Sequence, residues 1–124
     1  MSLHFRYRME FIAGRNAAFT GKVIDESFAY TDPSTYVEAV AHDIKFTASA
    51  SASINFGGIS VARAILIKGP LKMKVLLDGG ANEWVMDTGE NSEAIMFFKS
   101  SASALKLINM QANSGIVTVR ILGR

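Results

Sequence analysis

Hydrophobic and polar residues alternate along much of this chain with a period of two, which is the pattern of a half-buried β-strand. The N-terminal segment shows this most clearly: from Leu3 to Phe11 the odd positions are aromatic or aliphatic, and the even positions are His, Arg or Glu. We predict a strand from Leu3 to Ile12. Because this strand has a free end, residues 1–12 could pair with their own sheet or with a neighbouring molecule. A second, weaker strand is expected from Ala18 to Ile24.

Two apolar runs near the middle of the chain, Val61 to Ile67 and Leu71 to Leu77, are separated by Gly69 and Pro70. The first run is apolar at nearly every position, as expected for a strand that is covered on both faces. The second run alternates, which turns one of its faces toward a core. Proline lacks an N–H donor and restricts the residue before it, so the junction favours an open corner over a tight two-residue turn. The two runs are predicted to form the middle of a β-sandwich.

Shorter apolar segments follow, bounded by Gly, Asn, Ser or Asp residues that are typical of turns. These segments are Glu83 to Met86, Ala94 to Lys99, Leu105 to Met110 and Ile116 to Leu122. Short strands separated by turns about every 8 to 12 residues are typical of an antiparallel β-sandwich or a jelly roll. We therefore predict an all-β chain of about 8 to 10 short strands, folded as a single β-sandwich domain over residues 1–124.

The segment from Asp32 to Phe46 can be interpreted in two ways. Asp32 followed by Pro33 resembles the start of a helix, and apolar residues then recur at helical spacing, which would give a short helix near residues 33–44. The segment is also rich in β-branched and aromatic residues, and both of its neighbours are expected to be strands. These propensities favour a strand, with the helix kept as the alternative.

The composition adds the expectation of a partner surface. Hydrophobic residues make up 49% of the 124 residues, with 8 Phe and 6 Met, and the mean hydropathy is +0.21. One small domain cannot bury all of these groups, so we expect some of them to cover a contact with another subunit. The chain has no cysteine. It also lacks a signal-peptide core and a run of about 18 apolar residues, so we expect no cleavage and no membrane partner.

The charge pattern gives little reason to expect a nucleic-acid partner. The formal net charge is +2 at pH 7, and Lys68, Lys72 and Lys74 are close enough in sequence to form a small positive patch. Lysines in this arrangement more often keep an exposed strand edge soluble. We therefore expect no specific nucleic acid among the partners.

Candidate catalytic groups are few. His4 and His42 are the two histidines, so a metal site or a Ser-His-Asp arrangement would have to use one of them. His4 lies among arginines. His42 is followed directly by Asp43, whose side chain would point to the opposite face of a strand, where a base and its orienting carboxylate cannot meet. We expect no enzymatic activity, no metal site and no cofactor.

A carbohydrate-binding site is a further hypothesis, because small β-sandwiches can bind sugars with an exposed aromatic ring and a few polar side chains. Trp84, the single tryptophan, would be the platform, with Asn82, Asp87 and Asn91 as polar neighbours. A lone tryptophan on a strand is more often part of the core, because it is the largest apolar surface that the chain can bury. The two interpretations differ in whether Trp84 is exposed.

The second half of the chain resembles a family of small virion proteins. Four segments carry the resemblance: the end of an apolar strand at Ile65 to Lys68, the lysine-rich strand Leu71 to Leu77, the segment Leu105 to Asn109, and Val117 to Ile121 after a Gly turn. This pattern over residues 54–124 is similar to that of the short β-sandwich proteins encoded among the structural genes of tailed bacteriophages.

The resemblance implies a structural protein that is assembled in the host cytoplasm and takes its place in the virion. A capsid decoration (cement) protein is the first expectation, and a component of the tail or adsorption apparatus is the alternative. The implied partners are the major capsid protein or other virion proteins, and we expect a symmetric homo-oligomer, with a trimer favoured. At the subunit contact we expect Phe5, Arg6, Tyr7 and Arg8, whose apolar members would join a sheet while the arginines meet acidic groups.

Overall fold

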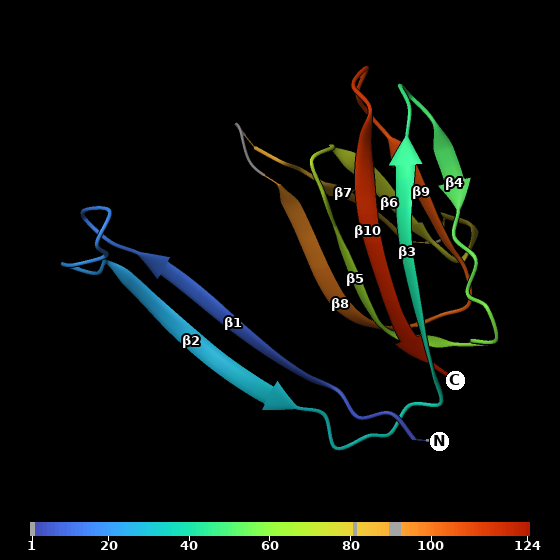
Figure 1. Cartoon of the computed structure of the whole chain (residues 1–124), viewed down its shortest axis with the longest axis horizontal. Helices are drawn as coiled ribbons and strands as arrows, with labels where there is room; N and C mark the ends of the chain where they lie inside the picture. Colours follow the sequence, from blue (N-terminus) through green and yellow to red (C-terminus); the bar gives the residue numbers. More distant parts are fainter. Residues whose placement is uncertain (1, 81, 90–92) are drawn as a thin grey trace. The chain divides into compact units, whose positions relative to one another are not determined.

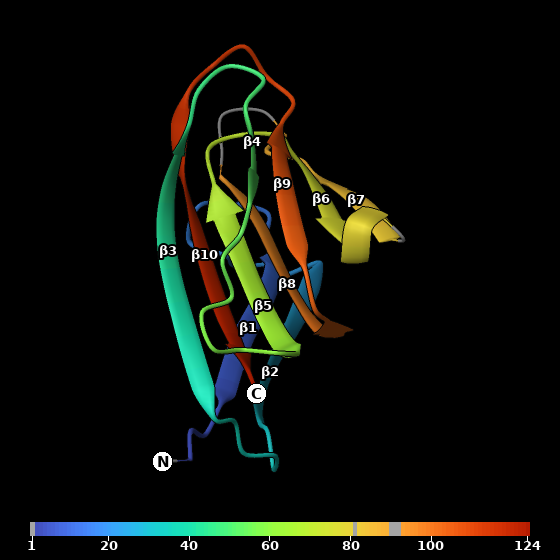
Figure 2. The ribbon, with the colours of Figure 1, turned by 90° about the vertical axis from the view of Figure 1, so that its right-hand side faces the viewer.

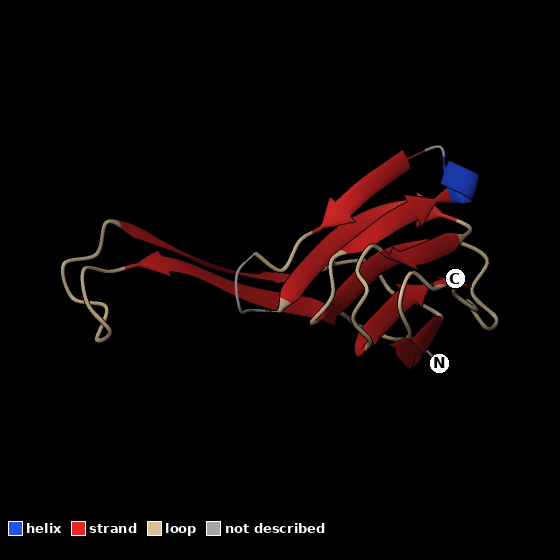
Figure 3. Cartoon of the chain, turned by 90° about the horizontal axis from the view of Figure 1, so that it is seen from above, coloured by secondary structure: helices blue, strands red, loops and turns tan. Residues whose placement is uncertain are grey.

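The computed structural model of the chain describes residues 2–80, 82–89 and 93–124. In these residues the structure is almost entirely β-strand, and its one helical element is a short 3-10 helix at Asp78–Gly80 (Figure 3). The chain divides into two compact units, Met1–Tyr36 and Val37–Arg124. The prediction of an all-β chain is confirmed, and the ten strands of the described residues match the predicted number.

The first unit is built on a β-hairpin. β1 (Arg6–Ala13) and β2 (Ile24–Thr31) pair antiparallel along their whole lengths and form a two-stranded sheet of their own (Figure 1). Side chains alternate between the two faces of each strand, so the predicted N-terminal strand is confirmed from Arg6 onward. Leu3 lies before β1 and forms an isolated bridge with Tyr36. The strand that pairs with this segment in the structure is β2 of the same chain.

The loop from Gly14 to Val23 lies where the sequence analysis expected the second strand. Its backbone enters the left-handed region at Phe19 (φ 57°) and Gly21 (φ 58°), and these angles interrupt an extended strand. The side chain of Asn16 holds the loop, because its Oδ1 accepts hydrogen bonds from the N–H groups of Ala18 (3.0 Å) and Thr20 (3.2 Å). The prediction of a strand over residues 18–24 is therefore wrong, and the second strand begins at Ile24.

The ambiguous segment after β2 contains no helix. Asp32 is buried, and its Oδ1 accepts a hydrogen bond from the N–H of Ser34 (2.9 Å), which gives a turn where a helix cap was the alternative. The hydroxyl of Tyr36 donates to Asp32, and the backbones of Leu3 and Tyr36 exchange two hydrogen bonds of 2.7 and 2.9 Å. From Glu38 to Phe46 the chain is strand β3. The preference for a strand is confirmed.

The second unit is a sandwich of two four-stranded antiparallel sheets (Figure 2). One sheet has the strand order β3-β10-β5-β8, and the other has the order β4-β9-β6-β7. The remaining strands are β4 (Ser51–Ser53), β5 (Ala62–Gly69), β6 (Met73–Leu77), β7 (Asn82–Met86), β8 (Ala94–Ala102), β9 (Leu105–Asn109) and β10 (Gly115–Gly123).

This strand order is that of a jelly roll. The pairs β3–β10, β4–β9, β5–β8 and β6–β7 are successive parts of one long antiparallel ribbon whose tip is the β6–β7 connection. When such a ribbon wraps around a core, strands of its C-terminal half also pair with strands of its N-terminal half that lie nearer the tip, which gives the two further pairs β10–β5 and β9–β6. The predicted jelly-roll-like β-sandwich is confirmed for this unit.

The hydrophobic core lies between the two sheets. Its side chains with 0–1% exposure include Ile65, Ile67, Val117, Val119 and Ile121 from one sheet and Met73, Val75 and Leu107 from the other. Because β5 and β6 belong to different sheets, the chain crosses between the sheets at Gly69 and Pro70. The open corner predicted for this junction is confirmed, since a tight turn would have kept both strands in one sheet.

Asn109, the last residue of β9, ties two loops together at one end of the sandwich. Its side chain is buried, and its Nδ2 donates hydrogen bonds to the carbonyl oxygens of Thr47 (2.9 Å) and Asn113 (2.8 Å). Its Oδ1 accepts a hydrogen bond from the N–H of Gln111 (3.0 Å). A buried amide whose donors and acceptor are all used fixes the β3–β4 loop against the β9–β10 loop.

Replacing Ile121 with Ala should destabilise the protein by about 2 to 4 kcal/mol, because the change removes buried methyl groups and leaves a cavity between the sheets. The matched control is Ile116→Ala in the same strand, where the side chain is 59% exposed and the loss should stay below about 1 kcal/mol. Urea unfolding followed by circular dichroism measures both losses. Equal losses for the two variants would contradict the assignment of the inner face of β10.

Candidate functional site

One face of the hairpin is apolar. The register brings six large side chains onto it: Tyr7, Met9 and Phe11 from β1, and Ile24, Phe28 and Tyr30 from β2. Phe11 is 63% exposed and Phe28 is 49% exposed. Seven of the 13 exposed large hydrophobic side chains that the structure describes lie within residues 9–30. Large exposed apolar patches are a common feature of interaction sites, so this face is the candidate site. We call these six side chains the apolar face of the hairpin.

Aromatic rings stiffen the end of the hairpin nearest to Tyr36. The ring of Tyr7 lies close to three others, with centroid separations of 5.8 Å for Phe5, 5.5 Å for Tyr30 and 6.3 Å for Phe28. Phe5 in turn meets Tyr36 edge to face at 6.3 Å. Ring pairs of this kind each contribute about 0.5 to 1.5 kcal/mol beyond simple burial. The hairpin is therefore braced by its own unit at this end.

The opposite face of the hairpin carries mainly charged and polar side chains, together with Ile12 and Ala29. Arg6 and Arg8 lie on it opposite Thr31 and Ala29, and both arginines are exposed. The residues predicted at the subunit contact are thus divided between two faces of one hairpin. Tyr7 belongs to the apolar face and Phe5 adjoins it, while Arg6 and Arg8 point to the other side. One flat contact cannot use all four side chains at once.

The sequence analysis missed the contribution of β2 to this surface. Phe28 and Tyr30 lie on the apolar face because Phe28 is opposite Met9 and Tyr30 is opposite Tyr7. The signal in the sequence is the alternation of Ile24, Phe28 and Tyr30 at even positions, which Glu26 interrupts. Because a strand was expected at residues 18–24 instead, this alternation was not recognised.

A two-stranded hairpin has no second layer with which to bury an apolar face. Isolated two-stranded hairpins are marginally stable in water, and a third strand or a packed layer is needed for independent stability. β1 and β2 each pair with one strand only, and together they form the whole of their sheet. Docking of the apolar face against another protein would supply the missing layer.

Trp84 lies on an edge strand of the sandwich. β7 pairs with β6 alone, and Trp84 is opposite the buried Val75, so the ring is on the inner side of its sheet. It packs against Phe98 of β8 with 6.0 Å between ring centroids, yet 42% of the residue remains exposed. The ring therefore covers the side of the sandwich between β7 and β8 while part of its surface stays accessible.

The polar neighbours proposed for a Trp84 platform have different surroundings. Asn82 shares the face of β7 with Trp84 because two positions separate them. Asp87 forms an ion pair with Lys72 (3.8 Å), and its Oδ1 accepts a hydrogen bond from the N–H of Gly89 (3.0 Å). The structure thus brings Asn82 to the side of Trp84 and directs Asp87 elsewhere. Asn91 lies outside the described residues.

The three lysines do not form one positive patch. Lys74 lies on the outer side of β6, and Lys72 directly precedes this strand. Lys72 pairs with Asp87 (3.8 Å) and Lys74 with Glu83 (3.3 Å). Lys68 belongs to β5 in the other sheet. Acidic partners compensate two of the three charges, which agrees with lysines that keep a strand surface solvated.

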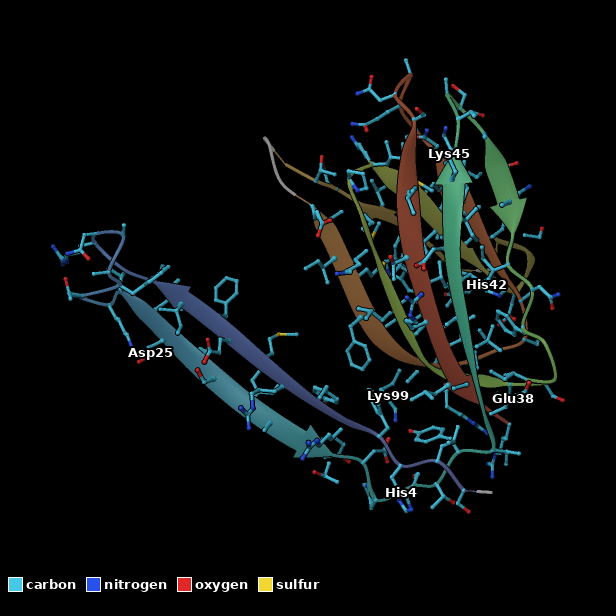
Figure 4. All side chains as sticks on the ribbon, in the orientation of Figure 1. His4, Asp25, Glu38, His42, Lys45 and Lys99 are labelled. Carbon is cyan, nitrogen blue, oxygen red and sulfur yellow. The ribbon has the colours of Figure 1, made fainter. Side chains whose placement is uncertain are left out.

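His42 and Asp43 point to opposite faces of β3, as the alternation predicts. The Nε2 of His42 lies 2.7 Å from the carbonyl oxygen of Asn55. The Oδ1 of Asp43 instead accepts hydrogen bonds from Arg120 (3.2 Å) and from the hydroxyl of Thr118 (3.1 Å) on β10. Figure 4 shows the position of His42 on β3. Asp43 is therefore committed to a cross-strand contact and does not orient the imidazole.

His4 is exposed, and within residues 2–80, 82–89 and 93–124 no group of three or more His, Cys, Asp or Glu is arranged to hold a metal ion. The same residues contain no helix with the length and apolar character needed to cross a membrane.

Two carboxylates have lowered pKa values, and both shifts have structural causes. The hydrogen bond from Arg120, followed by that from Thr118, lowers the pKa of Asp43. The pKa of Asp78 is lowered chiefly by the N–H of Ser103 (2.8 Å) and the Ser103 hydroxyl (3.1 Å). Asp78 thereby joins the 3-10 turn after β6 to the loop between β8 and β9. Both shifts come from hydrogen bonds that join separate parts of the fold.

Comparison of the chain with models of known protein families, with curated proteins and with solved structures finds no match. The function therefore has to be argued from the surfaces of the chain itself. Among the described residues, the apolar face of the hairpin is the richest in exposed aromatic and aliphatic side chains.

The Asp78 contact should make the protein sensitive to acid. Because the pKa of Asp78 is lower in the folded state than its ordinary value of 3.8, its contribution to stability is present above that value. This contribution is lost as the pH falls through the lowered pKa. Asp78→Asn should therefore have a flatter loss of stability below pH 3.8 than the parent chain, as measured by urea unfolding at a series of pH values.

Ser103→Ala is the matched variant for this prediction, because it removes the hydroxyl donor and keeps the N–H donor. It should fall between the parent and Asp78→Asn in its acid sensitivity. Identical acid profiles for all three proteins would contradict the role given to Asp78.

Proposed function

We propose that this chain is a non-enzymatic structural protein that binds neighbouring subunits through the apolar face of its hairpin. In its specific form, the proposal is a capsid decoration (cement) protein of a tailed bacteriophage. The observation that carries it is the exposure of Phe11, Phe28 and their neighbours on a two-stranded sheet that has no second layer of its own.

The design of the hairpin supports an assembly role. The end of the hairpin near Tyr36 is held by ring contacts, because Phe5, Tyr7 and Tyr36 pack together there. Beyond that end, the faces differ: one presents aromatic and aliphatic groups and the other presents Arg8 and Glu10. Stable interfaces combine an apolar centre with a polar rim, and this arrangement provides both on one element.

The viral part of the proposal is supported by fold-level and sequence-level analogy. Jelly rolls are common in viral capsid proteins, but they also occur in lectins, so the fold alone does not choose between these functions. The resemblance over residues 54–124 to small virion proteins of tailed bacteriophages favours the capsid. A component of the tail or adsorption apparatus is the nearest alternative, because the apolar face of the same hairpin could bind a tail subunit.

Substituting the apolar face should prevent assembly into particles. The double variant Met9→Lys with Phe11→Lys places two charges in the centre of the proposed contact, and it should lower incorporation by at least about tenfold, as expected when central anchors are lost. A tagged chain is produced in the organism that encodes it, phage particles from that organism are purified on a density gradient, and the tag in the particles is quantified by immunoblotting.

The matched control is Arg8→Ser with Glu10→Ser, which changes the same strand on its other face. This control should be incorporated like the parent chain. Full incorporation of the lysine variant, or absence of the parent chain from every particle, would contradict the proposal. Substitutions are preferable to removal of residues 1–12, because that deletion would also leave β2 without its partner strand.

Carbohydrate binding is the second candidate, favoured by the exposed part of Trp84 and by Asn82 on the same face. If it is correct, Trp84→Ala should abolish binding to a glycan array and leave the circular dichroism spectrum unchanged. Because the Trp84 ring also packs on Phe98, a loss of about 1 to 3 kcal/mol in stability is expected in either case. A parent chain that binds no glycan would remove this candidate.

A further inference from the structure

The outer face of the sheet β3-β10-β5-β8 is a second surface with apolar character. Inner and outer positions alternate along each strand. Val119 and Ile67 are buried on the inner face, so the residues next to them in their strands face outward. Apolar members of the outer set are Ala39 and Ala41 on β3, Ile116 and Leu122 on β10, Ala64 and Leu66 on β5, and Ile95 and Phe97 on β8. Ile95 is 67% exposed and Ile116 is 59% exposed.

The small side chains in this set make part of the outer face flat. In the register, Leu122 lies between Ala39 on one neighbouring strand and Ala64 on the other, and Ala41 follows opposite Arg120. Ala39 and Ala41 are exposed, whereas Ala64 is buried. Small exposed side chains next to Leu122 and Arg120 let a second β-layer come close to this part of the face, and layers pack about 10 Å apart.

Charge also distinguishes the outer face from the hairpin. The outer face carries four cationic side chains, Lys45, Lys68, Lys99 and Arg120, against one carboxylate, Asp43. On the apolar side of the hairpin, the charged residue among the paired residues is Glu26, which lies opposite Phe11. The two surfaces are thus complementary in sign.

Lys68 is the cation that matches Glu26 best. It is exposed, forms no ion pair with any residue within the described ranges, and has Ile95 opposite it on β8 and Leu66 two positions away. Glu26 has the same kind of surroundings, with Phe11 opposite it and Phe28 two positions away. Each of these two residues therefore has an apolar residue opposite it and another two positions away, Lys68 also lies opposite Thr118 of β10, and the two charges are opposite in sign.

The dimensions also agree. β1 and β2 have eight residues each and β10 has nine, so at about 3.4 Å per residue the hairpin is about 27 Å long and the central strand of the sheet about 31 Å. The hairpin can therefore lie along the sheet for its whole length.

We infer that the apolar face of the hairpin of one molecule packs on the outer face of the sheet β3-β10-β5-β8 of a second copy of this chain, with Glu26 against Lys68. The two surfaces differ, so a single contact leaves one hairpin and one sheet free. Two copies close when they exchange the contact reciprocally about a two-fold axis, and three or more copies close when they join head to tail in a ring. The inference rests on the proposed function, since it names the subunit that the hairpin binds.

Light scattering after size-exclusion chromatography of the full chain, over a range of concentrations, tests this inference without any virus particle. The parent chain should form a defined oligomer. Glu26→Lys alone and Lys68→Glu alone should each weaken self-association by at least about tenfold, because each brings like charges together in an apolar contact. The double variant should recover most of the parent's association, which is the signature of a direct pair.

Lys106→Glu is the matched control, because this exposed lysine lies on the other sheet, and it should associate like the parent. Circular dichroism must show the same folded spectrum for all variants. A parent chain that stays monomeric at every concentration would overturn the inference. So would a double variant whose loss of self-association equals the sum of the losses in the two single variants.

The two proposals fail in different ways. If the chain forms the oligomer and the charge exchange restores it, but purified particles lack the chain, then the inference stands and the proposed virion role falls. If the chain is found in particles through its apolar face but does not associate with itself, then the virion role stands and the second copy is the wrong partner.

Discussion

The fold depends on burial of the inner faces of two sheets against each other. β10 is central to this, because it pairs with both β3 and β5 and contributes Val117, Val119 and Ile121 to the core at 0–1% exposure. These pairings join strands that are far apart in the sequence, so the long ribbon is held in its wrapped form by contacts that exist only after wrapping. The corner at Gly69 and Pro70 belongs to the same constraint, since it lets the chain pass from one sheet to the other.

The hairpin has the same alternating pattern as the sandwich strands, but the pattern has a different structural result there. In the sandwich, each inner-facing residue meets a second layer, so alternation produces a core. In the hairpin, the alternation of Tyr7, Met9 and Phe11 produces an apolar face without a second layer in its own sheet. The same physical rule that folds the sandwich therefore favours binding of the hairpin to another protein.

Much of this structure follows from short-range patterns in the sequence. The strict alternation in Leu3 to Phe11 and the proline corner were sufficient to predict a strand and a change of sheet. The second strand was misplaced because two left-handed backbone positions and the hydrogen bonds of Asn16 decide the loop, and apolar content alone does not reveal them. The position of Trp84 was open for a different reason: it is set by the place of β7 at an edge, and strand order is a property of the whole chain.

Some charged side chains form contacts that stabilise the chain itself, and Lys68 differs from them. Asp43 binds Arg120 and Thr118, Asp78 binds the loop at Ser103, and Lys72 and Lys74 pair with Asp87 and Glu83. Lys68 forms no such ion pair in the described part of the chain, and it lies between Ile95 on one neighbouring strand and Thr118 on the other. A charge in those surroundings contributes little to the stability of one molecule, but in a contact that excludes water it makes the choice of partner specific. A second protein layer that carries one carboxylate satisfies both the charge and the apolar groups around it.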